Sequence, residues 1–322
     1  MPGPRVLIVT PYAAAANNGN WRTAARWSRL LRPDYRTIVQ TTGDPLPDAD
    51  AAIVLHARRS HAALAQWCAR RPRRPAILVM TGTDLYRDVP ARDADALASL
   101  RLADRIVVLQ ARGIAALPTK VRGKARVIFQ SAPTMVPAAK GDRRLRALLV
   151  GQLRPEKDAA TFLRAAARLT ARRDIALEIV GGMREDMSRD EIDRLLAAAP
   201  NVGLRGALAH AATRQRIRRA HVLVVPSRME GGANVIAEAL TAGTPVIASD
   251  CDGNVGMLGE RYAGYFPVGD DRALAALLER CRDDAAFLAR LARSCQARAP
   301  RFSPERERGA LLRALRELLG GR

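Results

Sequence analysis

The feature that most constrains the fold is an alternation of short apolar runs with amphipathic stretches along the whole chain. β-Branched runs such as 6–10 and 52–56 are separated by segments rich in Ala, Leu and Arg, for example 21–31 and 61–70. Strands joined by helices form parallel sheets, because a parallel connection must cross from one end of the sheet to the other. The pattern predicts an α/β fold of doubly wound, Rossmann-like type.

The alternation is interrupted once and then resumes, which predicts two domains. The segment 133–144 contains two prolines, a glycine and several charges and lacks periodicity, so we interpret it as a linker. A chain of 322 residues is long enough for two such cores. We expect domains at 1–143 and 144–302 and a closing helix at 303–322. The expected strands are 6–10, 37–41, 52–56, 76–81, 105–110 and 126–130, then 146–151, 175–181, 202–205, 221–226 and 245–250.

The charge balance is strongly basic, with a formal net charge of +21. Only four of the 53 basic residues are lysines, the charge is spread over both halves, and aromatic residues make up 4%. A nucleic-acid binder concentrates its basic residues in a tail or stripe and often interleaves aromatics. We therefore expect no nucleic-acid partner and assign the excess charge to attracting an anionic substrate.

Location and redox state follow from what the sequence lacks. No stretch approaches the ~20 apolar residues of a membrane span, and no export signal precedes the first strand. The four cysteines show no paired or zinc-binding spacing. These observations predict a cytoplasmic protein with reduced thiols and no membrane association.

The strongest motif follows the strand 221–226 and runs from Ser227 to Ser249. Glu230 and Glu238, eight positions apart, flank a Gly231–Gly232 turn that opens a helix. Glycines let backbone amides approach a ligand, and the start of a helix favours anions. Glu238 would then accept hydrogen bonds from vicinal hydroxyls such as those of a ribose. The plain alternative is a glycine-capped helix with two unrelated carboxylates.

This motif resembles the E-x7-E signature of the family 4 retaining glycosyltransferases, which have the GT-B fold. The resemblance implies two Rossmann-like domains facing each other across a cleft, with the last helix packing back across the linker. It also implies a nucleotide-sugar donor, no cofactor and no metal ion. Glu238 would hold the ribose and Glu230 the donor sugar, while the intervening residues would bind the sugar and diphosphate; these are Gly231, Gly232, Ala233 and Asn234.

A second element follows the strand 146–151. The family has an arginine and a lysine here that neutralise the donor diphosphate. Lys157 matches the lysine, but Gln152 stands where the arginine is expected. Either Arg154 substitutes for it, or the leaving group is held with less positive charge. The alternative for Lys157 is a surface lysine in the first turn of a helix.

The loop after the first strand holds Asn17 to Arg22, where the family has a glycine-rich loop over the reacting sugar. Asn18 is a candidate catalytic residue and Gly19 a donor contact. Asn20, Trp21 and Arg22 are candidates for the acceptor site. Asparagine also caps helices, which is the alternative for Asn18.

Further acceptor-side candidates follow the third and fourth strands. Many relatives have a histidine about here, where this chain has Thr81 and Asp84, and the nearest histidine in a comparable position at the end of a strand is His56. Arg58 beside His56 would suit an anionic acceptor; the alternative is a helix start with surface arginines. His61, His210 and His221 are expected to be structural.

Several short segments together resemble the selenosugar synthases of bacterial selenoneine biosynthesis. They are Ala-Asn-Asn-Gly-Asn-Trp, Leu-His-Ala-Arg-Arg-Ser, Thr-Gly-Thr-Asp-Leu-Tyr, Phe-Gln-Ser-Ala and Gly-Gln-Leu-Arg-Pro-Glu-Lys. This resemblance implies transfer of N-acetylglucosamine from UDP-GlcNAc to selenophosphate, with other enzymes of the pathway as partners. Three alternatives stay open: a lipid or envelope-glycan acceptor, a nucleotide-sugar epimerase, and a non-enzymatic basic binding module.

Overall fold

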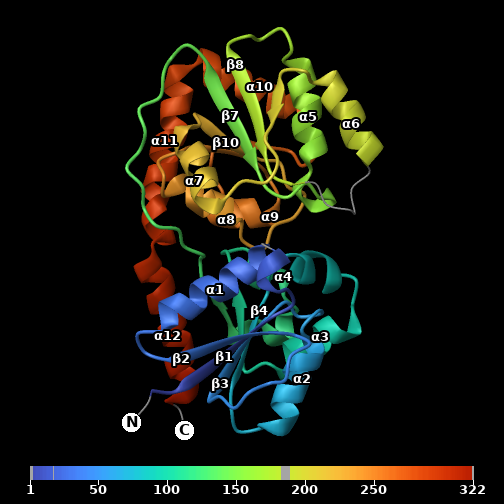
Figure 1. Cartoon of the computed structure of the whole chain (residues 1–322), viewed down its shortest axis with the longest axis vertical. Helices are drawn as coiled ribbons and strands as arrows, with labels where there is room; N and C mark the ends of the chain where they lie inside the picture. The colour runs from blue at the N-terminus through green and yellow to red at the C-terminus, as the bar shows by residue number, and fades with distance from the viewer. Residues whose placement is uncertain (1–2, 17, 183–188, 321–322) are drawn as a thin grey trace. The chain divides into compact units, whose positions relative to one another are not determined.

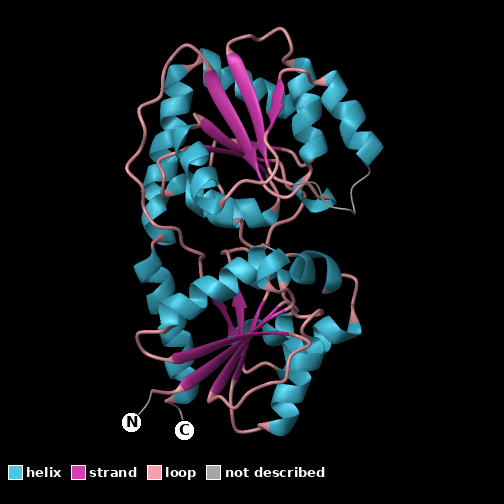
Figure 2. Ribbon diagram, viewed as in Figure 1, coloured by secondary structure: helices cyan, strands magenta, loops and turns pink. Residues whose placement is uncertain are grey.

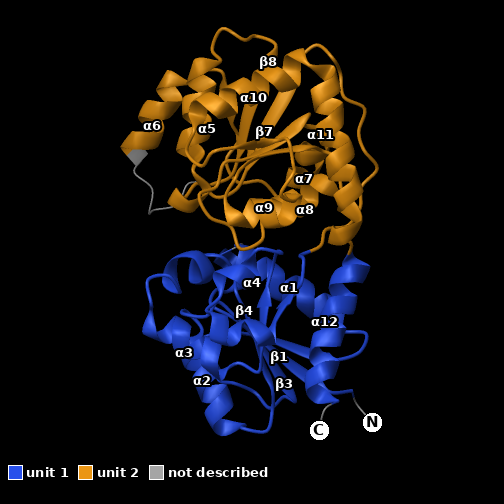
Figure 3. Ribbon diagram, turned by 180° about the vertical axis from the view of Figure 1, so that it is seen from behind, with its two compact units in different colours: residues 1–130, 304–322 blue, residues 131–303 orange. Residues whose placement is uncertain are grey.

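The computed structural model describes residues 3–16, 18–182 and 189–320, so Asn17 of the first loop lies outside it. The chain folds into two compact units (Figure 3). Unit 1 consists of Met1–Gln130 and Pro304–Arg322, and unit 2 of Ser131–Ser303.

The predicted linker belongs to unit 2 rather than to the first domain. The Ala132 amide donates to the Phe302 carbonyl at 3.1 Å, and the Met135 amide donates to the Thr241 carbonyl at 2.9 Å. These backbone bonds attach the start of the segment after Gln130 to unit 2. The chain crosses back at Pro304, so the last helix is part of unit 1.

Unit 1 is a parallel sheet of six strands in the order β2-β1-β3-β4-β5-β6 (Figure 1). Its strands are β1 (Arg5–Thr10), β2 (Arg36–Thr41), β3 (Ala51–Leu55), β4 (Ala76–Val79), β5 (Arg105–Val108) and β6 (Ala125–Val127). Its helices are α1 (Gly19–Leu31), α2 (His61–Arg70), α3 (Ala94–Leu102), α4 (Gly113–Ala116) and α12 (Pro304–Leu319), with short helical turns at Ala14–Ala16, Asp84–Asp88 and Thr119–Lys124.

The two faces of this sheet carry separate cores, because successive strand residues point to opposite sides. Leu7 and Val54 pack with α2 and α3 on one face. Ile8 and Ile53 pack with α1 and α12 on the other. Burial on both faces explains why these strands are apolar throughout rather than alternating.

Unit 2 repeats the architecture with the order β12-β11-β10-β7-β8-β9, and helices again lie on both sides of the sheet (Figure 2). Its strands are β7 (Leu145–Val150), β8 (Ile175–Val180), β9 (Val202–Leu204), β10 (Val222–Val225), β11 (Val246–Ser249) and β12 (Tyr265–Phe266). Its helices are α5 (Ala159–Arg168), α6 (Arg189–Ala198), α7 (His210–Arg219), α8 (Asn234–Leu240), α9 (Asp252–Leu258), α10 (Asp271–Asp283) and α11 (Ala285–Arg298), with short turns at Pro155–Lys157 and Ala299–Phe302.

Strand order fixes where each unit can bind a ligand. In unit 2 the chain builds outward from β7 to β8 and β9, then returns to place β10 on the other side of β7. In unit 1 the corresponding reversal lies between β1 and β3. Open parallel sheets bind ligands outside the carboxyl ends of their strands at such a switch point. The loops after β7 and β10, and those after β1 and β3, are therefore the places to examine.

The predicted fold class of two Rossmann-like α/β units is confirmed, and each predicted strand is present within a few residues of its expected limits. The expected opposition of the two domains across a cleft stays a prediction. The two-residue strand β12 and the short turn Asp84–Asp88 were not anticipated. Among residues 3–16, 18–182 and 189–320, no helix is long and apolar enough to cross a membrane.

Candidate active site

Two loops meet at the switch point of unit 2 through a partly buried ion pair. Lys157 ends the turn that follows β7, and Glu230 lies in the loop that follows β10. The Lys157 Nζ lies 2.5 Å from Glu230 Oε1, and the Ser227 hydroxyl donates to the same oxygen at 2.6 Å. Glu230 is 6% exposed. Residues 73 positions apart are thus joined because β7 and β10 are neighbours in the sheet.

Glu230 is supported from behind by α9 and the end of β11. The Ser249 hydroxyl donates to the Ser227 carbonyl at 2.5 Å, and the Asn254 amide group donates to Ser249 Oγ at 3.0 Å. Gly253 packs so closely that a Cβ there would lie 2.0 Å from the Glu230 carbonyl oxygen. The position of the Glu230 carboxylate is therefore set by packing and hydrogen bonds rather than by the loop alone.

The same two loops are tied together on both sides of Lys157. The Arg228 amide donates to the Glu156 carbonyl at 2.9 Å, and Arg228 Nε lies 3.1 Å from Asp158 Oδ2. Asp158 has φ of 48° and accepts from the Thr161 amide, so it begins α5. Arg154 is 3.9 Å from Glu156. Lys157 therefore lies between joined loops and is partly buried, unlike a lysine on an open surface.

Glu238 lies one turn into α8 and is 6% exposed. Its Oε1 is 2.8 Å from His210 Nε2 at the start of α7. Within the described part of the chain, its Oε2 is buried and has no hydrogen-bond partner. A carboxylate oxygen that is buried without a hydrogen bond is energetically costly. A ligand group that donates a hydrogen bond to this oxygen would therefore be favoured.

The remaining predicted donor contacts lie in these two loops. Gly231 and Ala233 are buried, and Gly232, Asn234 and Gln152 are half-buried. Burial raises the pKa of the nearby Cys251 thiol to about 11, so this group stays protonated and packs as an apolar side chain. The edge therefore combines an ammonium group, two carboxylates and a glycine turn.

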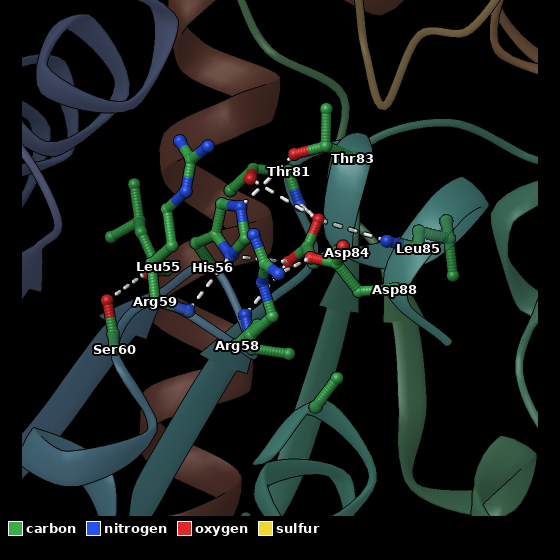
Figure 4. Close-up of polar contacts among 12 residues, drawn as sticks. Leu55, His56, Arg58, Arg59, Ser60, Thr81, Thr83, Asp84, Leu85 and Asp88 are labelled. Atoms are coloured by element: carbon green, nitrogen blue, oxygen red, sulfur yellow. Dashed lines mark hydrogen bonds and ion pairs between the residues drawn. The ribbon is translucent and has the colours of Figure 1, made fainter. Parts of the chain in front are cut away.

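In unit 1 the acceptor candidates after β3 and β4 do come together, around the carboxylate of Asp84 (Figure 4). Asp84 is fully buried and accepts hydrogen bonds from the amides of Ala57, Thr81, Gly82 and Leu85 at 2.8–3.1 Å. All of these donors come from the two loops themselves. Asp84 therefore joins the loops together instead of presenting an oxygen to a ligand.

His56 is also enclosed, with 1% exposure and a φ of 75° that is strained for a residue with a side chain. The Arg59 amide donates to its Nδ1 at 3.3 Å, so the ring hydrogen is on Nε2, which donates to Thr83 Oγ1 at 3.1 Å. Arg58 Nε lies 3.2 Å from Asp88 and is partly exposed. The loop thus presents arginines, not the histidine ring (Figure 4).

The loop after β1 contributes a helix cap. Asn18 Oδ1 accepts from the Trp21 amide at 3.1 Å and begins α1. Asn20, Trp21 and Arg22 are half-buried, and Gly19 is exposed. Tyr12 from this loop packs 5.2 Å below the Arg59 guanidinium, which links the loops after β1 and β3 across the switch point of unit 1.

Residues 144–284 match the family model described as "Glycosyl transferases group 1". This part of unit 2 is therefore similar to the group 1 glycosyl transferases. The matched segment contains Lys157, Glu230 and Glu238, and it starts at β7, the first strand of unit 2.

Solved structures of similar fold extend the likeness from unit 2 to the whole chain. Sucrose-phosphate synthase from Thermosynechococcus elongatus has a TM-score of 0.82 and 19% identity, covering 99% of this chain and 100% of that one. Anabaena HepE in complex with UDP and glucose has a TM-score of 0.76 and 16% identity, covering 98% of this chain and 100% of that one. The whole chain therefore has the fold of GT-B glycosyltransferases.

Among curated proteins, alpha-D-kanosaminyltransferase of Streptomyces kanamyceticus is 27% identical over 234 residues. The match covers 71% of this chain and 57% of that protein. The chain thus spans little more than half the length of this relative.

Unit 2 also contains contacts that sequence reasoning missed. His210 was assigned a structural role, yet it contacts Glu238. No sequence pattern marks Gly253, because its role comes only from the close packing of α9 against Glu230. His61 and His221 do make internal hydrogen bonds, to Ser99 and to the Gly141 carbonyl.

Proposed function

We propose that the protein is a glycosyltransferase that takes its sugar from a nucleotide-sugar held at the β7–β10 edge of unit 2. The observation that carries this proposal is the meeting of Lys157 and Glu230 at the switch point, within the segment that matches the glycosyl transferase family. The UDP bound to the similarly folded HepE supports a UDP-linked donor.

Each group at this edge has a role that its chemistry suits. Lys157 and the amides around Gly231 would stabilise the negative charge that develops on the departing diphosphate. Glu238 would accept hydrogen bonds from the ribose, and Glu230 would contact the sugar. Because Lys157 and Glu230 are paired at 2.5 Å, a bound diphosphate would draw the ammonium group away from the carboxylate. The proposal includes no metal ion or cofactor.

For the reaction itself, we propose transfer of N-acetylglucosamine from UDP-GlcNAc to selenophosphate. The selenium atom attacks the anomeric carbon, the bond between that carbon and the UDP oxygen breaks, and UDP leaves with the bonding electrons. The first product is a sugar joined through selenium to phosphate. Attack of water on phosphorus then breaks the selenium–phosphorus bond, giving a selenosugar and inorganic phosphate.

The loops of unit 1 support an acceptor of this kind. Both carboxylate oxygens of Asp84 accept hydrogen bonds from backbone amides, and the His56 ring is hydrogen-bonded to Thr83 and to the Arg59 amide. Neither group is placed to remove a proton from an incoming hydroxyl. A selenium anion needs no such base, and the partly exposed Arg58 would attract its phosphate group.

The test is a transfer assay with the full-length protein. We expect UDP-GlcNAc and selenophosphate to give UDP and a selenium-containing N-acetylglucosamine, detected by mass spectrometry. Thiophosphate and common sugar and lipid acceptors serve as competitors, and chelator is added to one arm. UDP release with a sugar or lipid acceptor, but no selenosugar, would overturn the acceptor assignment and leave the donor assignment standing.

A further inference from the structure

His210 lies at the start of α7 and contacts the carboxylate of Glu238 on the neighbouring helix α8. The distance from His210 Nε2 to Glu238 Oε1 is 2.8 Å, while the histidine side chain is 53% exposed. An ionised carboxylate only accepts hydrogen bonds, so the hydrogen of this contact is on His210 Nε2. Both the neutral ring with that hydrogen and the protonated ring can make it.

Arg214 lies one turn further along α7 and interacts electrostatically with Glu238. It is 6% exposed, and its Nη2 donates to the Pro133 carbonyl at 2.6 Å. Burial lowers the pKa of Arg214, and the charge of Glu238 opposes that effect. Of the two basic side chains, which are spaced four residues apart on one helix, only His210 makes a hydrogen bond to the Glu238 carboxylate, and Arg214 acts on it through its charge.

The two oxygens of Glu238 differ in what holds them. Oε1 accepts from His210, whereas Oε2 is buried and has no donor among the residues that the structure describes. A carboxylate on an unrestrained side chain could rotate and exchange its oxygens. A fixed hydrogen bond to one oxygen defines the direction in which the other accepts.

We propose that His210 is a positioning residue, which fixes the Glu238 carboxylate so that Oε2 accepts a ribose hydroxyl of the bound nucleotide. This inference rests on the proposed function, because it presumes that Glu238 holds the nucleotide. It assigns His210 no contact with the reacting atoms. His210 would contribute to discrimination between ribose and deoxyribose. Glu238 Oε2 would be left without a hydrogen bond when the nucleotide lacks the hydroxyl.

The experiment compares UDP, 2′-deoxy-UDP and 3′-deoxy-UDP by isothermal titration calorimetry on the full-length chain. We expect wild type to prefer UDP over at least one deoxy form by about tenfold or more. His210→Ala should weaken UDP about five- to tenfold and leave that deoxy form within about twofold, which reduces the preference. With UDP-sugar as substrate, KM should rise while kcat stays nearly constant.

Two further variants separate positioning from a general structural role. His210→Gln keeps an N–H donor near the same place and should restore most of the discrimination. Gln215→Ala, an exposed position on the same helix, should behave as wild type. Equal weakening of all three nucleotides by His210→Ala, or unchanged discrimination, would overturn the inference. If wild type bound no UDP at all, the proposed function would fall with it.

Discussion

At the scale of single residues, the Glu230 carboxylate depends for its position on the side chains around it. Glu230 is held by Ser227 and Lys157, and Ser227 is held in turn by Ser249. A shift of one of these side chains would change the direction of the Glu230 carboxylate. The contacts through Ser227 and Ser249 would keep the Glu230 carboxylate in place when Lys157 moves toward a bound diphosphate, which lowers the cost of binding.

Gly253→Ala tests this dependence. The new Cβ would lie 2.0 Å from the Glu230 carbonyl and 2.5 Å from its Cβ, so the loop must move. We expect kcat/KM for the UDP-sugar to fall at least about tenfold, roughly the effect of losing one aligned polar contact. Gly309→Ala in α12, where the nearest atom is 3.5 Å away, is the matched control and should keep full activity. Wild-type activity in Gly253→Ala would contradict the account.

A second residue-scale prediction concerns pH. His221 Nδ1 accepts from the Arg146 amide, and its Nε2 donates to the Gly141 carbonyl. Burial lowers the pKa of His221, the bond to Gly141 opposes this, and the nearby charges of Arg146, Lys140 and Arg282 lower it further. The unfolded chain therefore takes up this proton first as pH falls through about 6.5.

Stability contributed by the neutral His221 should accordingly be present above that pH and lost below it. We expect the urea midpoint, followed by circular dichroism, to decrease from pH 7.5 to pH 5.5. In His221→Gln, which has no titrating group here, the decrease should be smaller. An identical pH dependence in both proteins would show that another group is responsible.

At the scale of elements, α12 completes a core whose other parts lie in residues 6–128. Leu311, Leu312 and Leu315 pack with α1 against the β1 face of the unit 1 sheet. Glu307 is 1% exposed and accepts from Trp27 Nε1 at 2.7 Å and from Arg26 Nε at 2.9 Å. The last helix is thus a structural part of unit 1.

Leu315→Ala should destabilise unit 1 by about 2–5 kcal/mol, the usual cost of emptying a fully buried leucine site. All three tryptophans, Trp21, Trp27 and Trp67, lie in unit 1, so their fluorescence reports its unfolding in urea. Leu319→Ala, at a half-buried position of the same helix, should cost clearly less. Equal small losses for both variants would contradict the packing described.

Element identity was predictable from sequence because buried parallel strands and amphipathic helices have distinct periods. Strand order was not predictable, because no local sequence pattern indicates that β10 pairs with β7 rather than with β9. The motifs of Lys157 and Glu230 could therefore be found separately, but their 2.5 Å contact could not. His210 was missed for the same reason, since its partner is 28 residues away on another helix.

At the scale of the whole molecule, the chain combines two units that each have a switch point lined by basic and polar loops. Unit 2 presents Lys157 and two carboxylates, and unit 1 presents arginines above loops joined by Asp84. The formal net charge of +21 would favour encounter with anionic substrates, more strongly at low salt. The assignment of donor chemistry to unit 2 is the claim on which the rest depends.

The most direct test of that claim is a calorimetric titration of UDP into the full-length protein and into two variants. Wild type should bind UDP, Glu238→Ala should weaken binding at least about tenfold, or 1.4 kcal/mol, and the exposed Glu305→Ala should bind as wild type does. No binding of UDP to wild type, or equal affinity in Glu238→Ala, would show that the β7–β10 edge is not a nucleotide-sugar site.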